Sequence, residues 1–187
     1  MHSQRLLPSL PALALVVATL PAVTLAADNP GSHQHGHADL QIAIDGEHID
    51  VFLLSPAANL VGFEQAPTND QQRQAVAGLT AWASQTPLIN TLAGSCTVNS
   101  ADVHATWPKN DDHNHGHEQG HDHHSGHADF EISQALACPG LAAGAELETG
   151  LMARFAAVEQ IDVQWVSPQG QGGSRLTPEQ YRFRLSR

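Results

Sequence analysis

The segment HADLQIAIDGEHIDVFLL, residues 37–54, decides the fold. Residues 38–44 alternate apolar and polar side chains, which is typical of a half-buried strand. Asp45-Gly46 favours a tight hairpin turn, and residues 48–54 supply the returning strand. The segment therefore predicts an antiparallel hairpin near the start of the folded region.

The rest of the chain predicts two helices and further strands around this hairpin. Thr68 and Gln71 form a capping box, which predicts a helix to about Ser84. A second helix is predicted over about 146–157, and 167–174 is predicted to be a Gly/Gln-rich turn. The remaining strands are predicted at 96–107, 126–132 running toward Cys138, 161–166 and 181–185. This order predicts an α+β fold, a mainly antiparallel sheet with two helices on one face.

A short motif occurs twice in the sequence. Residues 36–42 read GHADLQI and residues 126–132 read GHADFEI. In both places a His-rich run leads directly into a predicted strand. The match suggests an internal duplication, in which each His-Ala-Asp start would occupy an equivalent sheet position.

The N-terminus predicts export. Arg5 precedes an apolar stretch over 6–25, and small residues favour cleavage near Ala26. An uncleaved transmembrane anchor is the alternative, but three prolines interrupt the stretch. We therefore predict a signal peptide over 1–26 and a periplasmic protein that does not insert into the membrane after cleavage. Residues 27–187 are predicted to form one domain with a His-rich loop, 108–127, inserted.

Charge and cysteine content narrow the function further. The formal net charge of -11 argues against a nucleic-acid partner, which needs a basic face. Export favours one disulfide between Cys96 and Cys138 over two buried thiols or direct metal ligation. Such a bridge would span the densest His segment and tie its base together.

Histidine is the compositional outlier, with 13 residues against a single lysine. Two clusters hold most of them, and the second places seven within residues 113–127. The clusters are His33, His35 and His37, then His113, His115, His117, His121, His123, His124 and His127. Imidazoles with interleaved carboxylates suit Zn²⁺, Cu²⁺ or Ni²⁺, whereas Ca²⁺ and Mg²⁺ prefer oxygen ligands. A pH-sensitive linker, charged as imidazoles protonate, is the alternative.

A better-ordered metal site is expected beside the loops. If the two strand starts are neighbours, His35, His37 and His127 would share a site. Asp39 and Asp129 lie two residues along the strands, on the same face as His37 and His127, and would serve as ligands or orient an imidazole. His104, near the root of the loop, is a further candidate ligand. Glu64 is expected at the surface rather than as an acid supporting the site.

The sequence offers poor signatures of an enzyme. There is no nucleophile elbow, phosphate-binding loop or His-Glu-x-x-His helix. A hydrolytic zinc site would need rigid ligands and a placed base. We therefore expect a metal-binding protein rather than an enzyme.

Several of these segments together resemble the ZrgA family of periplasmic zinc-binding proteins. The resemblance depends on HGHADL at 35–40, SPAANLVGFE at 55–64, the His/Asp loop with its two flanking cysteines, and IDVQWVSPQGQ at 161–171. It covers nearly the whole mature chain. Family members usually have His after the Gly-Phe-Glu segment, whereas this chain has Gln65, so a ligand at that position is lost.

The resemblance implies a zinc binder that supports uptake. It implies capture of Zn²⁺ by deprotonated imidazoles and transfer to the solute-binding protein of an ABC-type zinc importer, with weaker binding below about pH 6. Two alternatives stay open. One is a copper, nickel or general metal buffer, because Cu²⁺ outcompetes Zn²⁺ at most nitrogen sites. The other is an interaction domain with a pH-sensitive loop.

Overall fold

The computed structural model describes residues 34–108 and 127–185 and confirms the α+β class. Strands dominate, and the helices are few. The elements are β1 (His37–Asp45), β2 (His48–Pro56), α1 (Ala57–Val61), α2 (Asp70–Ala83), β3 (Asn90–Thr91), β4 (Thr97–Thr106), β5 (Asp129–Ala137), β6 (Glu146–Glu148), α3 (Leu151–Arg154), β7 (Gln160–Ser167), β8 (Gly170–Leu176) and β9 (Arg182–Arg184).

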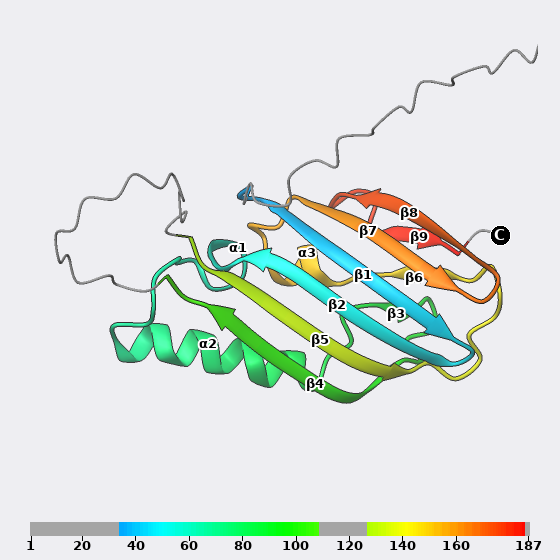
Figure 1. Ribbon diagram of the computed structural model, residues 1–187, viewed down its shortest axis with the longest axis horizontal. Coiled ribbons are helices and arrows are strands. Elements are labelled where there is room, and N and C mark those ends of the chain that lie inside the picture. Colours follow the sequence, from blue (N-terminus) through cyan, green and yellow to red (C-terminus); the bar gives the residue numbers. More distant parts are fainter. Residues whose placement is uncertain (1–33, 109–126, 186–187) are drawn as a thin grey trace, which may run out of the picture. The chain divides into compact units, whose positions relative to one another are not determined.

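A six-stranded sheet carries the fold, with the strands side by side in the order β4-β5-β2-β1-β7-β8 (Figure 1). The predicted hairpin is present as β1 and β2, which pair from Asp39↔Leu54 to Asp45↔His48. All neighbours in this sheet are antiparallel except β1 and β7, so the prediction of a mainly antiparallel sheet is confirmed. A small second sheet has the order β3-β6-β9.

One hydrophobic core lies on a single face of the large sheet. Leu40 and Ile42 of β1 and Phe130 and Ile132 of β5 are buried on this face, while the alternate residue Gln41 is exposed. The core also includes Leu79 of α2 and residues of the three-stranded sheet. The uncovered face of the large sheet is therefore the polar side of an ordinary half-buried sheet.

The first predicted helix is present as α2, but its cap differs from the prediction by one residue. Asn69, not Thr68, is the N-cap, and its side chain accepts a hydrogen bond from Gln72 N at 2.9 Å. The Gln72 side chain in turn accepts from Thr68 N at 2.8 Å. The pairs Thr68/Gln71 and Asn69/Gln72 have the same spacing, and Thr and Asn are both good N-cap residues. The sequence therefore did not show which of the two begins the helix.

The predicted helix over 146–157 is wrong. Residues 146–148 form strand β6 between β3 and β9, and only Leu151–Arg154 are helical. Leu147, Leu151 and Phe155 are all buried as expected. Their apolar spacing is satisfied by a strand and one short helix with Gly150 as its N-cap, because residues 146–148 pair with β3 on one side and β9 on the other.

The turn predicted over 167–174 is confined to residues 168–169, because Gly170–Leu176 form strand β8 paired with β7. Gly172 lies opposite Trp165, and a Cβ there would come within 2.7 Å of the indole. The glycine that suggested a turn instead makes room for a buried tryptophan.

Cys96 and Cys138 form the expected disulfide. It lies beside the Thr97↔Ala137 pair, whereas the chain leaves β4 and enters β5 at the Thr106↔Asp129 pair. These ends are about 30 Å apart along the ladder. The expectation that the bridge ties the base of the His-rich loop is therefore wrong, since it closes the opposite end of the β4–β5 pair.

Candidate metal centre

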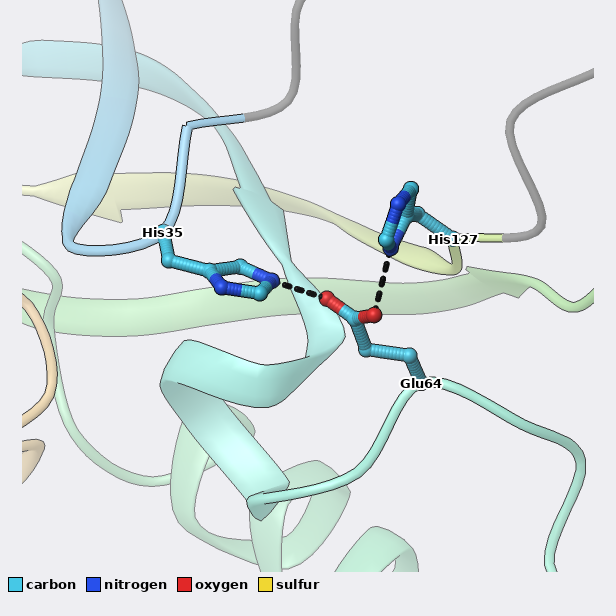
Figure 2. Close-up of side chains that lie close together, drawn as sticks. All are labelled: His35, Glu64 and His127. Carbon is cyan, nitrogen blue, oxygen red and sulfur yellow. Dashed lines mark hydrogen bonds and ion pairs between the residues drawn. The ribbon is translucent and has the colours of Figure 1, made fainter. Parts of the chain in front are cut away.

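Three segments far apart in the sequence bring His35, Glu64 and His127 together (Figure 2). One ligand atom from each lies within 4.8 Å of the others. Within residues 34–108 and 127–185, this is the group of His, Cys, Asp and Glu side chains arranged closely enough to hold one metal ion. It is therefore the candidate functional site of the described chain.

A glycine turn before β1 presents His35. Gly36 has a φ of 82°, which favours glycine, and its carbonyl accepts hydrogen bonds from Glu159 N at 2.7 Å and Gln160 N at 2.9 Å. Its N–H donates to the side chain of Asn59 at 2.9 Å. The backbone beside His35 is thus held by α1 on one side and by the start of β7 on the other.

The sheet register explains why His127 meets His35. Strand β2 lies between β1 and β5, and its Leu54 faces Asp39 on one side and Glu131 on the other. The two GHAD motifs are therefore displaced by two residues in space. Continued along both strands, this register makes His127 level with His35 rather than with its sequence counterpart His37.

Glu64 reaches the site because α1 ends abruptly. Gly62 takes the left-handed conformation at the C-cap, with φ of 84°, and turns the chain outward. Phe63 then stacks on Trp107, with ring centroids 5.9 Å apart and an interplanar angle of 9°. Trp107 also contacts the buried ring of Phe130, so the loop that carries Glu64 is anchored to the core.

The carboxylate of Glu64 bridges the two imidazoles. Its Oε1 is hydrogen bonded to His35 Nε2 and its Oε2 to His127 Nδ1 (Figure 2). Burial by itself raises the pKa of Glu64, but the hydrogen bonds from His127 and His35 outweigh it, and the pKa lies below its ordinary value. Glu64 is therefore a carboxylate at neutral pH, the form that binds a cation.

The site is accessible to solvent. The side chains of His35 and His127 are 62% and 44% exposed, whereas Glu64 is 19% exposed. The imidazole rings lie edge to face with centroids 5.9 Å apart. Two nitrogens and one carboxylate oxygen form a donor set suited to Zn²⁺, and three protein ligands leave a fourth position open toward solvent.

The structure brings together only part of the predicted ligand set. His35 and His127 meet, but His37, Asp39, Asp129 and His104 lie outside the group around Glu64. His104 is opposite Glu131, two residues before the end of β4, and Asp129 is largely buried, its N–H donating to Thr106 Oγ1 at 3.1 Å. The predicted ligands His33, His113, His115, His117, His121, His123 and His124 lie outside the described residues.

Asp39 belongs to a different cluster. It is opposite Asp162 in the parallel β1–β7 pair, and Asp162 accepts a hydrogen bond from Arg175 Nε at 2.8 Å. Burial and the Asp162 charge raise the pKa of Asp39, and His37 only partly offsets them. Asp39 therefore lies outside the group around Glu64, and its expected role in orienting His37 stays a prediction.

Glu64 is the residue that the sequence analysis undervalued. It was expected at the surface, yet it is half-buried and contacts both histidines. The signals in the sequence were Gly62 before it and the segment SPAANLVGFE at 55–64, and neither shows which side chains Glu64 meets. The contact depends on the placement of α1 between the two strand starts.

Comparison with known proteins identifies one family. The family described as "ZrgA family zinc uptake protein" matches residues 32–185. No curated protein matches the chain. Among the described residues, none of the helices has the length and apolar character needed to cross a membrane.

Proposed function

Because the chain belongs to the ZrgA family of zinc uptake proteins, we propose that it captures Zn²⁺ at His35, Glu64 and His127. In this proposal the protein is a binder and not an enzyme. It acts in the periplasm and supplies the solute-binding protein of an ABC-type importer. The observation that carries the proposal is the convergence of two imidazoles and one carboxylate within 4.8 Å.

The chemistry of the ligands supports zinc as the cargo. Zn²⁺ binds readily to two imidazoles and a carboxylate, with water or a further ligand in the fourth position. Each ligand atom that would bind the ion is now hydrogen bonded to another member of the group. Zinc would replace these hydrogen bonds after each bonded imidazole nitrogen gives up its proton, to solvent or to the other ring nitrogen, and it would neutralise part of the Glu64 charge.

Accessibility supports capture and release rather than a structural metal. A structural zinc site is usually closed by four protein ligands, whereas both histidines here are exposed. An incoming ligand from an acceptor protein has access to the open position. The His-rich segment 113–124 comes just before His127 in the sequence, and we propose that it raises the local supply of zinc.

Export is supported by the disulfide and by the sequence of the N-terminus. A Cys96–Cys138 bridge persists in an oxidising compartment such as the periplasm. Expression controlled by zinc, rather than by copper or nickel, would distinguish uptake from detoxification.

Zinc titration by calorimetry at pH 7.4 tests the proposal. We compare the mature chain with a loop-silent chain of the same length, in which the six histidines between 113 and 124 are replaced by asparagine. The mature chain is expected to bind several ions. The loop-silent chain is expected to retain one site, which His127→Ala removes.

His48→Ala is the matched control, because His48 is an exposed histidine at the other end of the sheet, opposite Asp45. It should leave the retained site intact. If the loop-silent chain binds no zinc, or if His127→Ala has no effect on its binding, the proposed site is wrong.

A further inference from the structure

We infer that Asn59 is a positioning residue for this site and that its buried amide sets the zinc affinity without contacting the ion. The inference rests on the proposed function. Asn59 is only 4% exposed and lies in the middle of α1. Neither the sequence patterns nor the family match assigns it a role.

The amide of Asn59 fixes the turn that carries His35. Its Oδ1 accepts from Gly36 N at 2.9 Å, and its Nδ2 donates to His37 O at 2.8 Å. Nδ2 also lies 3.3 Å from Ser55 Oγ, which ties the amide to the end of β2. One side chain therefore holds the backbone on both sides of the turn, next to the residue that presents an imidazole.

The same short helix holds the other two ligands. Its first residue, Ala57, donates through N–H to Ala128 O at 2.7 Å, directly beside His127. Its end at Gly62 directs the chain toward Glu64. Because α1 contacts all three ligand segments, a shift between α1 and the Gly36 turn would move His35 relative to Glu64 and His127.

The exposure of His35 makes this backbone anchor important. Its side chain is 62% exposed, so packing against neighbours contributes little to its position. Metal affinity depends on ligands that are held in place before the ion arrives, and loss of the groups that orient ligands weakens it. The Asn59 amide holds His35 in place indirectly, because it fixes the backbone of the neighbouring residues Gly36 and His37.

Gln134 offers a matched control elsewhere in the core. It is also a buried amide, 3% exposed, and it also makes three hydrogen bonds. These bonds join β5 to the end of α2 and the segment after it, through Ala83 O, Thr86 O and Leu88 N. It lies seven residues beyond His127, about 23 Å along the strand.

The experiment compares Asn59→Leu and Gln134→Met in the loop-silent chain. Zinc affinity is measured by competition with a chromophoric chelator, and stability of the metal-free protein by thermal unfolding. Asn59→Leu is expected to weaken zinc binding by about 10- to 100-fold. Gln134→Met is expected to lower Tm while zinc affinity stays within about twofold, because distant sites act independently.

The absorption spectrum of bound Co²⁺ supplies a readout of ligand geometry. It should change in Asn59→Leu and stay unchanged in Gln134→Met. If Asn59→Leu does not fold, Asn59→Asp replaces it, since it keeps the acceptor for Gly36 N–H and loses the donor to His37 O. We expect Asn59→Asp to bind zinc more weakly than the parent.

Two failures can be told apart. If Asn59→Leu and Asn59→Asp bind zinc like the parent while His127→Ala does not, the site stands and the role of Asn59 is wrong. If Gln134→Met weakens zinc binding as much as Asn59→Leu does, the effect is general destabilisation and the inference is overturned. If His127→Ala binds like the parent, the proposed function itself fails.

Discussion

At the scale of single residues, the site depends on one carboxylate shared by two imidazoles. Glu64 is half-buried and hydrogen bonded to His35 and His127, and its pKa is lowered by those bonds despite the opposing effect of burial. Asp39 shows the opposite behaviour, because burial and its neighbour Asp162 raise its pKa. The pKa values of these two acids, which lie near the same end of the sheet, are therefore shifted in opposite directions.

Glu64→Gln should weaken zinc binding while leaving the fold intact. Glutamine keeps the size of the side chain but lacks the negative charge that compensates Zn²⁺ and is a poorer zinc ligand. We expect the affinity of the loop-silent chain to fall at least about tenfold in a chelator competition assay. The control is Glu179→Gln at an exposed position outside the group around Glu64, and an unchanged affinity in Glu64→Gln would contradict a ligand role.

Asp39→Asn should stabilise the metal-free protein at neutral pH. The raised pKa means that the folded state disfavours the ionised form, so the wild type loses stability as the pH rises above the ordinary value of 3.8. The gain from asparagine should be present at pH 7 and disappear as both proteins are acidified through that range. Thermal unfolding as a function of pH measures it, and the gain should be modest because the Asp39 side chain is only partly withdrawn from solvent.

The same variant separates Asp39 from the metal site. Its zinc affinity should equal that of the parent, because Asp39 lies beside Asp162 and outside the group around Glu64. Weaker zinc binding in Asp39→Asn would restore Asp39 as a ligand, as the sequence pattern suggested.

At the scale of elements, a glycine in strand β8 and a glycine in helix α2 contribute differently to stability. Gly172 in β8 lies against the buried indole of Trp165, where a Cβ would come within 2.7 Å. Gly78 in α2 is exposed and has nothing within 4 Å of an added Cβ. The first glycine is required by packing, whereas the second only weakens a helix.

Gly172→Ala and Gly78→Ala should therefore change stability in opposite directions. The methyl group at Gly172 forces the indole or the strand to move, which costs about 1–3 kcal/mol. The methyl group at Gly78 should add about 0.5–1 kcal/mol through helix propensity. Urea denaturation of both variants measures the difference, and stabilisation by Gly172→Ala would show that β8 is not packed on Trp165.

At the scale of the whole described domain, the disulfide and the metal site occupy opposite ends of one sheet. Cys96 and Cys138 flank the Thr97↔Ala137 pair, whereas His127 precedes the Thr106↔Asp129 pair. The covalent link and the candidate metal site are thus at different ends of β5. Stability and zinc binding should be separable by mutation.

The double variant Cys96→Ser with Cys138→Ser tests this separation. The bridge joins residues 42 apart in sequence. A loop of this length corresponds to about 4 kcal/mol of unfolding free energy in the chain-entropy model. We expect a loss of that order in urea denaturation with the zinc affinity unchanged; a parallel loss of zinc affinity in a folded variant would contradict independence of the two ends.

The sequence by itself determined the features that depend on local pattern. Alternation predicted β1, β2, β4, β5 and β7, the Asp45-Gly46 turn predicted their first hairpin, and composition predicted metal chemistry. Glycine spacing was misleading over 167–174, and apolar spacing over 146–157, because a packed partner strand overrides a local preference.

Only the tertiary structure decided which ligands meet. The sequence aligned His37 with His127, but β2 pairs with its two neighbours in registers that differ by two residues, so His35 takes that place. Glu64 joins them because α1 lies against both strand starts, a contact between residues 29 and 63 positions apart in sequence. Local periodicity contains no information on register between distant strands, because register is set by how the whole core packs.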